Sequence, residues 1–149
     1  MQNSDADTLS AWTALLVAHR RLVTQLDAQL RAGADMTLDE YDLLFQLRRG
    51  GRPLTMTELA DQALVSRAST TRLVDRLVER GWADRWNDDL DRRRVMVQLT
   101  EQGRRAQRVA GRLHLEGIAQ LVGVPLAGRD VKALTAALVA LGSGALDRH

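Results

Sequence analysis

The chain has 149 residues, of which 45% are hydrophobic and 27% are charged. This length and balance are typical of a folded globular protein, and they exclude a disordered chain. The absence of cysteine excludes disulfides, thiolate metal sites and thiol redox switches. No apolar run approaches the length of a membrane span, and the polar first seven residues do not form an export signal, so we expect a cytoplasmic protein.

The formal net charge is only +2, but nearly all of the positive charge is arginine, with Lys132 as the only lysine. Arginine binds phosphate and guanine through paired hydrogen bonds. A GC-rich genome would also enrich arginine, so composition does not decide between these two explanations. The positions of the arginines along the chain therefore carry the argument.

Amphipathic helices open the chain. A long helix is predicted over Leu9–Arg31, because apolar side chains recur there at spacings of three and four residues. We expect Gly33 to stop this helix. A second helix is predicted to begin at Thr37, which precedes Glu40 by the spacing of a capping box, and to end at Gly50–Gly51.

A short helix and a longer one follow, separated by a tight turn. Thr55 and Glu58 repeat the capping-box spacing and begin a short helix that runs to about Gln62. Ser66 is expected to cap a helix that runs to Arg80. The predicted apolar stripe of this longer helix consists of Thr70, Leu73, Val74 and Leu77.

The hydrophobic pattern changes its period after Gly81. Residues 82–86 are short and aromatic-rich, and residues 95–99 alternate in the manner of a strand. The charged segment 87–94 lies between them, so the sequence predicts a β-hairpin with a charged tip. Beyond the hairpin we expect a long helix that reaches Gly123, a break at Pro125 and Gly128, and a last helix over Asp130–Leu141.

The order of short helix, turn, helix and hairpin is that of a helix-turn-helix followed by a wing. We therefore predict a mainly α fold with a small β-hairpin wing, flanked by long N- and C-terminal helices. The major groove of DNA admits one α-helix, and residues near the N-terminus of that helix reach the base edges. The arginines of the hairpin tip are placed to reach a narrow minor groove, which attracts arginine.

The candidate DNA-binding residues lie off the apolar stripe of the helix capped by Ser66, or at the hairpin tip. They are Ser66, Arg67, Ser69, Thr71, Arg72, Arg76, Asp91, Arg92, Arg93 and Arg94. Taken singly, a helix start rich in serine and arginine, or an arginine-rich loop, is also typical of a solvated surface. The two features in this order, between long apolar helices, favour a protein that binds double-stranded DNA.

At these residues the sequence resembles the MarR family of bacterial transcriptional regulators. The matching stretches are residues 54–60, 65–77 and 79–81, and in the wing Asp91-Arg92-Arg93 followed by residues 97–100. The wing pattern is the most specific of these signatures. Thr70 departs from the family pattern, which usually has an aliphatic core residue there. We expect its hydroxyl to bond to a backbone carbonyl inside the helix.

The resemblance implies a homodimer on an inverted-repeat operator. Residues 1–34 and 101–149 would form the dimerisation helices, and residues 35–100 would form the DNA-binding lobe. Residues 66–72 would read the major groove, Arg76 would hold the DNA backbone, and Arg93 would enter the minor groove with Asp91 orienting it. The implied function is transcription regulation, with repression as the family default.

Regulation by a small aromatic or phenolic ligand is a further implication of the resemblance. The candidate lining residues are Trp12, His19, Tyr41, Phe45 and Arg112. All but Arg112 are equally typical of packed core or interface side chains. A ligand-independent repressor, a winged helix that docks proteins, and a ligand-binding helical dimer that no longer binds DNA stay open as alternatives. The residues offer no catalytic, cofactor-binding or metal-binding motif, so we expect no enzyme, no cofactor and no metal.

Overall fold

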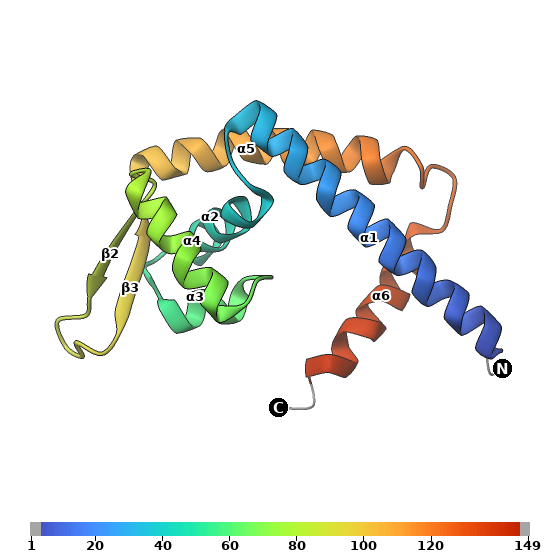
Figure 1. The fold of residues 1–149 in the computed structure, drawn as a ribbon, viewed down its shortest axis with the longest axis horizontal. Coiled ribbons are helices and arrows are strands. Elements are labelled where there is room, and N and C mark those ends of the chain that lie inside the picture. Colours follow the sequence, from blue (N-terminus) through green and yellow to red (C-terminus); the bar gives the residue numbers. More distant parts are fainter. Residues whose placement is uncertain (1–3, 147–149) are drawn as a thin grey trace. The chain divides into compact units, whose positions relative to one another are not determined.

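The computed structural model describes residues 4–146, and their side chains as far as residue 142. It divides the chain into two compact units, residues 1–117 and 118–149. The first unit holds helices and a small antiparallel sheet, and its sheet and helices α2–α4 form one lobe (Figure 1). The elements are α1 (Asp5–Ala34), α2 (Leu38–Gly50), β1 (Leu54–Thr55), α3 (Met56–Gln62), α4 (Arg67–Glu79), β2 (Ala83–Asn87), β3 (Val95–Leu99), α5 (Glu101–Ile118), η1 (Ala119–Gly123) and α6 (Val131–Leu146).

Helix α1 is longer at both ends than the sequence pattern predicts. Its N-cap is Ser4, whose hydroxyl accepts the backbone N–H of Asp7. The prediction that Gly33 stops the helix is wrong, because α1 continues to Ala34 and Asp35 takes the left-handed conformation. A Cβ at position 33 would lie 2.7 Å from Cδ1 of Leu113, so this glycine allows α5 to approach α1 closely.

The caps of the next three helices are confirmed. Thr37 and Glu40 form a reciprocal capping box on α2, and Thr55 and Glu58 form another on α3. The Ser66 hydroxyl accepts the backbone N–H of Ser69 at the start of α4. These caps satisfy backbone N–H groups that a helix start leaves without partners, and they fix where each helix begins.

The sheet has three strands in the order β1-β3-β2. The predicted hairpin is confirmed, with Ala83 opposite Leu99 and Asn87 opposite Val95. The short strand β1 was not predicted; it pairs with the free edge of β3 through Leu54 opposite Val97. This pairing joins the base of the wing to the start of α3.

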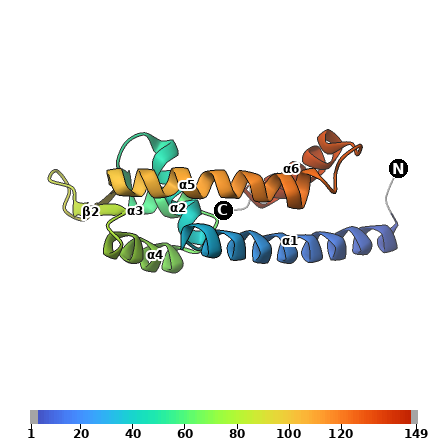
Figure 2. The ribbon, with the colours of Figure 1, turned by 90° about the horizontal axis from the view of Figure 1, so that it is seen from above.

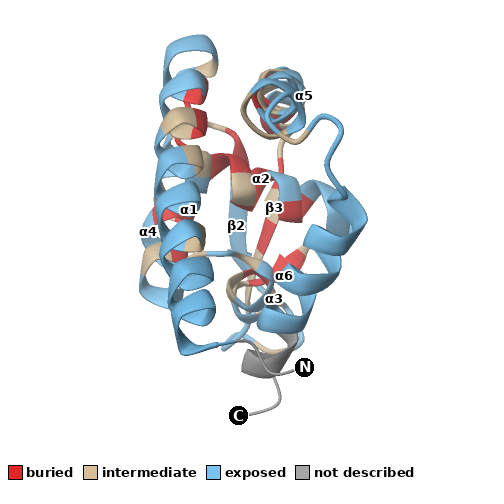
Figure 3. Ribbon diagram, turned by 90° about the vertical axis from the view of Figure 1, so that its right-hand side faces the viewer, coloured by how far each residue is buried: buried red, intermediate tan, exposed pale blue. Residues whose placement is uncertain are grey.

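The core lies where α2, α4 and β3 meet, as the buried residues in Figure 3 show. Its fully buried members include Leu43, Leu44, Leu59, Val74, Leu77 and Val97. The C-terminal part of α1 joins this core through Leu30, whereas the N-terminal part extends away from the lobe (Figures 1 and 2). The lobe therefore has its own apolar core, to which most of α1 does not contribute.

The chain after Ile118 departs from the predicted pattern. The long helix was expected to reach Gly123, but α5 ends at Ile118 and a π-helical segment, η1, covers Ala119–Gly123. The last helix, α6, begins after Asp130, whose carboxylate accepts the backbone N–H of Ala133. It runs to Leu146, past the predicted end at Leu141.

Among the residues that the structure describes, no helix is long and apolar enough to cross a membrane.

Candidate nucleic-acid interface

The N-terminal half of α4 presents polar side chains to solvent. Arg67 and Arg72 are exposed, and the Arg67 guanidinium lies 2.8 Å from a carboxylate oxygen of Asp61. The Ser66 hydroxyl donates to that of Ser69, and the Thr71 hydroxyl is directed to the carbonyl oxygen of Arg67. The predicted reading residues thus lie together at the helix N-terminus, where the backbone N–H groups and the helix dipole favour an anion such as phosphate.

The opposite face of α4 fixes the helix on the lobe. Its predicted apolar stripe is confirmed, since Thr70, Leu73, Val74 and Leu77 are all buried. The Thr70 side chain is 0% exposed, and its hydroxyl donates to the carbonyl oxygen of Ser66 at 3.0 Å. The threonine therefore fits the core as expected, with its one polar group satisfied inside the helix.

A buried carboxylate links α4 to α2. Glu40 is 0% exposed, and its Oε2 accepts the backbone N–H of Thr37 at 2.8 Å. Its Oε1 lies 2.7 Å from Nη2 of Arg76, and its Oε2 lies 3.7 Å from Nη1 of Arg80. Arg76, predicted to hold the DNA backbone, is thus anchored on its inner side while half of its side chain stays exposed. Its role toward DNA stays a prediction.

Arg80 extends this network to the wing. Its guanidinium carbon lies 3.6 Å from the centroid of the Trp82 ring, and its Nη2 lies 3.1 Å from Asp35. Trp82 directly precedes β2, and its backbone carbonyl accepts the N–H of Thr100. From the end of α4, Arg80 therefore contacts the α1–α2 junction, α2 and the base of the wing.

The loop between β2 and β3, residues 88–94, is called the wing tip below. The Arg93 Nε lies 3.1 Å from Oδ1 of Asp91, and the same oxygen accepts the Arg93 backbone N–H at 3.2 Å. These bonds from Arg93 hold the pKa of the Asp91 carboxyl below its usual range. Asp91 therefore contacts Arg93 in the manner expected of an orienting residue, while the Arg93 side chain stays 91% exposed.

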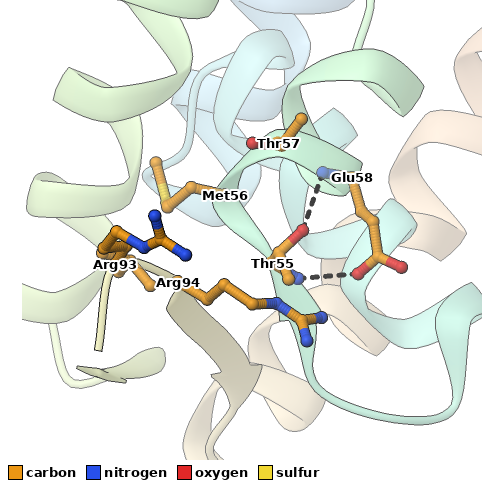
Figure 4. A pocket seen from close by; sticks show the side chains of 7 residues that line it. Thr55, Met56, Thr57, Glu58, Arg93 and Arg94 are labelled. Carbon is orange, nitrogen blue, oxygen red and sulfur yellow. Dashed lines mark hydrogen bonds between the residues drawn. The ribbon is translucent and has the colours of Figure 1, made fainter. Parts of the chain in front are cut away.

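Two shallow hollows border the wing. One, of about 310 Å³, lies where the start of α3 faces Arg93, Arg94 and Val95 (Figure 4). The other, of about 350 Å³, lies between α4 and the hairpin and is lined by Met56, Thr71, Arg85, Trp86, Asn87 and Val95. Both combine polar and apolar walls next to predicted DNA-binding residues.

The predicted ligand residues are only partly brought together. Tyr41 and Phe45 are in tilted contact, with ring centroids 6.2 Å apart. Tyr41 also packs on His114, at 4.7 Å between centroids, and burial lowers the pKa of His114. Trp12, His19 and Arg112 are exposed, and none of the five predicted residues lines either hollow at the wing. The ligand site stays a prediction.

Sequence reasoning missed the roles of two residues of this site. Glu40 was identified only as a helix cap, because its arginine partner is far along the chain. Arg85 of β2 forms an ion pair with Asp75 of α4 and lines the hollow beside Thr71. An arginine on the exposed face of a predicted strand is the only sequence signal for it.

This fold and this surface define a winged helix-turn-helix protein. The MarR family model matches residues 34–94. The chain is 34% identical to the multiple antibiotic resistance protein MarR of Escherichia coli (strain K12), over 71% of this chain and 67% of that protein. The chain belongs to the MarR family of transcriptional regulators, which is not a family of enzymes.

Two further relatives bear on the site. Sco3205, a MarR family transcriptional regulator from Streptomyces coelicolor whose crystal structure is a complex with DNA, superimposes with a TM-score of 0.87 and 29% identity, covering 97% of this chain and 91% of that chain. The transcriptional regulator PecS of Dickeya dadantii (strain 3937) is 35% identical over 43% of this chain. The matches to the first curated relatives span only 40% and 44% of the length of those proteins.

Proposed function

We propose that the protein is a sequence-specific DNA-binding repressor that acts as a homodimer in the cytoplasm. The observation that carries this proposal is the N-terminal half of α4, which exposes Arg67 and Arg72 beside a wing tipped with Arg93. Sco3205, which shares the fold, was crystallised with DNA. A helix start for the major groove and an arginine hairpin for the minor groove suit neighbouring surfaces of one duplex.

The proposed homodimer is supported by apolar surface outside the lobe. On α1, Leu9, Trp12 and Leu16 are 64%, 56% and 48% exposed, at spacings of three and four residues. On α6, Leu134, Leu138 and Leu141 are 40%, 43% and 66% exposed. Helix faces of this kind need a partner, and a second copy of the chain offers the same faces by two-fold symmetry. Such a dimer is expected to read an inverted repeat.

Release by a small aromatic anion is a second step of the proposal. Phe45 is 41% exposed although its ring contacts buried Tyr41, so an aromatic edge is open to solvent on α2. A ligand bound there is expected to weaken DNA binding by a coupling free energy of about 1–3 kcal/mol. If salicylate-like compounds change neither DNA affinity nor the melting temperature, a ligand-independent repressor is the better account.

The test of DNA binding compares Arg72→Ala with Arg93→Ala. Titrations would use the DNA upstream of the protein's own gene and a scrambled duplex, at several salt concentrations. Arg72→Ala is expected to cost about 1–3 kcal/mol on the preferred site and to relax preference at one base position per half-site. Arg93→Ala is expected to weaken binding to both duplexes and to lower the log–log salt slope by about one per subunit.

Three results would oppose the proposal. If neither variant affects DNA affinity, this surface does not bind DNA. If the wild-type protein does not distinguish the upstream DNA from the scrambled duplex, it is not sequence-specific for that site. A footprint that covers a single asymmetric half-site would count against the homodimer on an inverted repeat.

A further inference from the structure

Leu90 stands at the wing tip with 98% of its surface exposed. The exposed leucines of α1 and α6 lie on helix faces for which a second copy is a natural partner. Leu90 instead lies among charged residues in the loop between β2 and β3. That loop is the end of the hairpin away from α5 (Figure 1). Removing a leucine side chain from water is favourable, so a surface that covers Leu90 would gain affinity from the contact.

The backbone of the wing tip is fixed by hydrogen bonds. The Asp88 N–H donates to the Arg94 carbonyl at 2.9 Å, and the Asn87 side-chain amide donates to the Arg92 carbonyl at 2.8 Å. The Leu90 N–H itself donates to Oδ1 of Asp88 at 3.0 Å. Leu90 therefore lies on a hydrogen-bonded loop, so a contact with DNA would cost little backbone conformational entropy.

The charges around Leu90 are balanced. The wing tip contains three aspartates and three arginines. Asp88 lies 3.6 Å from the Arg94 guanidinium and Asp91 lies 3.1 Å from that of Arg93. Two of the acidic groups are thus offset by arginines, which lowers the repulsion that carboxylates would meet at a polyanion. The Arg93 side chain nevertheless stays 91% exposed, so its charge is still open to a phosphate or a groove.

We propose that Leu90 is a DNA-contacting residue that enters the minor groove beside the arginines and packs against the deoxyribose walls. This inference rests on the proposed DNA binding. The minor groove is lined by sugar C–H groups, and apolar side chains such as leucine are used as wedges there. Leucine has no hydrogen-bonding group, so it reads the width and shape of the groove and not the identity of the base pairs.

The experiment compares Leu90→Ser and Leu90→Met in DNA titrations across a series of salt concentrations, with Arg93→Ala alongside. Leu90→Ser is expected to weaken operator binding roughly tenfold for a dimer with two wings, because apolar area stays in water. Its salt slope is expected to equal that of the wild type, since no phosphate contact is lost. Leu90→Met keeps an apolar side chain and is expected to bind within about twofold of the wild type.

Three results would overturn the inference. If Leu90→Ser binds the operator as tightly as the wild type, Leu90 does not contact DNA, and a protein partner becomes the alternative for this side chain. A salt slope lowered as in Arg93→Ala would mean that the substitution acts through the arginines. Equal losses in Leu90→Ser and Leu90→Met would mean that apolar contact is not the cause. If only the inference about Leu90 is wrong, the wild-type protein still prefers the operator to scrambled DNA. If the proposed function is wrong, the wild-type protein shows no such preference. Thermal unfolding provides the folding control, because a side chain this exposed should not affect the melting temperature.

Discussion

Single side chains in this protein serve several elements at once, and Glu40 is the clearest case. Its Oε2 closes the capping box of α2 and also faces Arg80 at the end of α4, while its Oε1 faces Arg76 within α4. A fully buried carboxylate is costly unless it is hydrogen-bonded and paired, and here it is both. Glu40 therefore helps to orient α4 on α2, together with the buried apolar stripe of α4.

Two substitutions of Glu40 separate its roles. Glu40→Gln keeps a side chain that can accept the Thr37 N–H but removes the charge that faces two guanidinium groups. We expect it to lower the free energy of unfolding by about 1.5–3 kcal/mol, the range for hydrogen bonds to charged groups. Glu40→Ala also leaves the cap open and is expected to cost about 1 kcal/mol more. Urea unfolding measures both. Equal losses in the two variants would show that the cap contributes nothing beyond the charge.

The Glu58 carboxylate gives the protein a pH-dependent contribution to stability. The Arg52 guanidinium, with the backbone N–H of Thr55, lowers the pKa of Glu58 from 4.5 to about 2. Because the folded pKa lies below the unfolded value, this contribution is complete above pH 4.5 and is lost as the pH falls toward 2. The pair is partly exposed, so we expect a small effect, within the 0–1 kcal/mol typical of surface ion pairs.

The variant Glu58→Gln tests this contribution because glutamine can cap α3 but does not titrate. Urea unfolding at about pH 5 and about pH 3 should show a smaller fall in unfolding free energy for the variant than for the wild type. The comparison within each protein removes the constant cost of the substitution. An equal fall in both proteins would exclude Glu58 as a source of the acid sensitivity.

At the scale of elements, helix starts were predictable and close approaches were not. A cap is a local event, so the spacing of Thr55 and Glu58 was enough to place the start of α3. Gly33 was misread because the local preference for glycine at helix ends says nothing of Leu113, which packs against it from α5. Strand β1 was missed for the same reason: Leu54 and Thr55 form a strand only because β3 offers its free edge.

The contacts of the candidate site also divide into local ones, between residues near in sequence, and tertiary ones, between different elements. The exposed start of α4 follows from the position of its residues off the apolar stripe, and the family resemblance implied the Asp91–Arg93 contact between residues close in sequence. The pairing of Glu40 with Arg76 joins α2 to α4, and that of Asp75 with Arg85 joins α4 to β2. Such ion pairs depend on tertiary packing, so no spacing within one segment could indicate them.

Two glycines of α5 make a matched test of these close approaches. A Cβ at Gly103 would lie 1.9 Å from the backbone oxygen of Trp82, which cannot move aside as a flexible side chain can. At Gly111 the nearest neighbour, Nε2 of Gln107, would lie at an ordinary 3.6 Å. Gly103→Ala is therefore expected to destabilise the fold by about 1–3 kcal/mol or more. Gly111→Ala should stabilise it by about 0.5–1 kcal/mol through helix propensity.

Thermal and urea unfolding of the two alanine variants check this pair of predictions. Opposite signs are expected from the same chemical change in the same helix. A loss at Gly111 as large as that at Gly103 would mean that α5 tolerates no side chain on this face, and that the distance to Trp82 is not the decisive feature.

At the scale of the whole molecule, the core of the lobe and the apolar surface outside it involve different residues. The main core runs from Leu30 to Ala110 and does not include the N-terminal half of α1. Leu16 in that half is 48% exposed, and Leu138 of α6 is 43% exposed. The lobe can therefore stay folded when these side chains are changed. The proposed dimer depends on them, so it should dissociate.

The wild-type protein is expected to sediment at twice the chain mass of 16.5 kDa at micromolar concentration. Leu16→Asp places a charge on the proposed interface, so we expect dissociation to chains of single mass whose lobe keeps its helical circular dichroism. Leu30→Asp is the control, because Leu30 is 0% exposed in the core and its substitution should unfold the lobe. The dissociated Leu16→Asp chains should also bind operator DNA far more weakly, since each lobe then binds a half-site without the effective concentration that its partner provides. A wild-type protein that sediments at the mass of one chain would contradict the dimer. A Leu16→Asp protein that still sediments as a dimer would place the interface elsewhere.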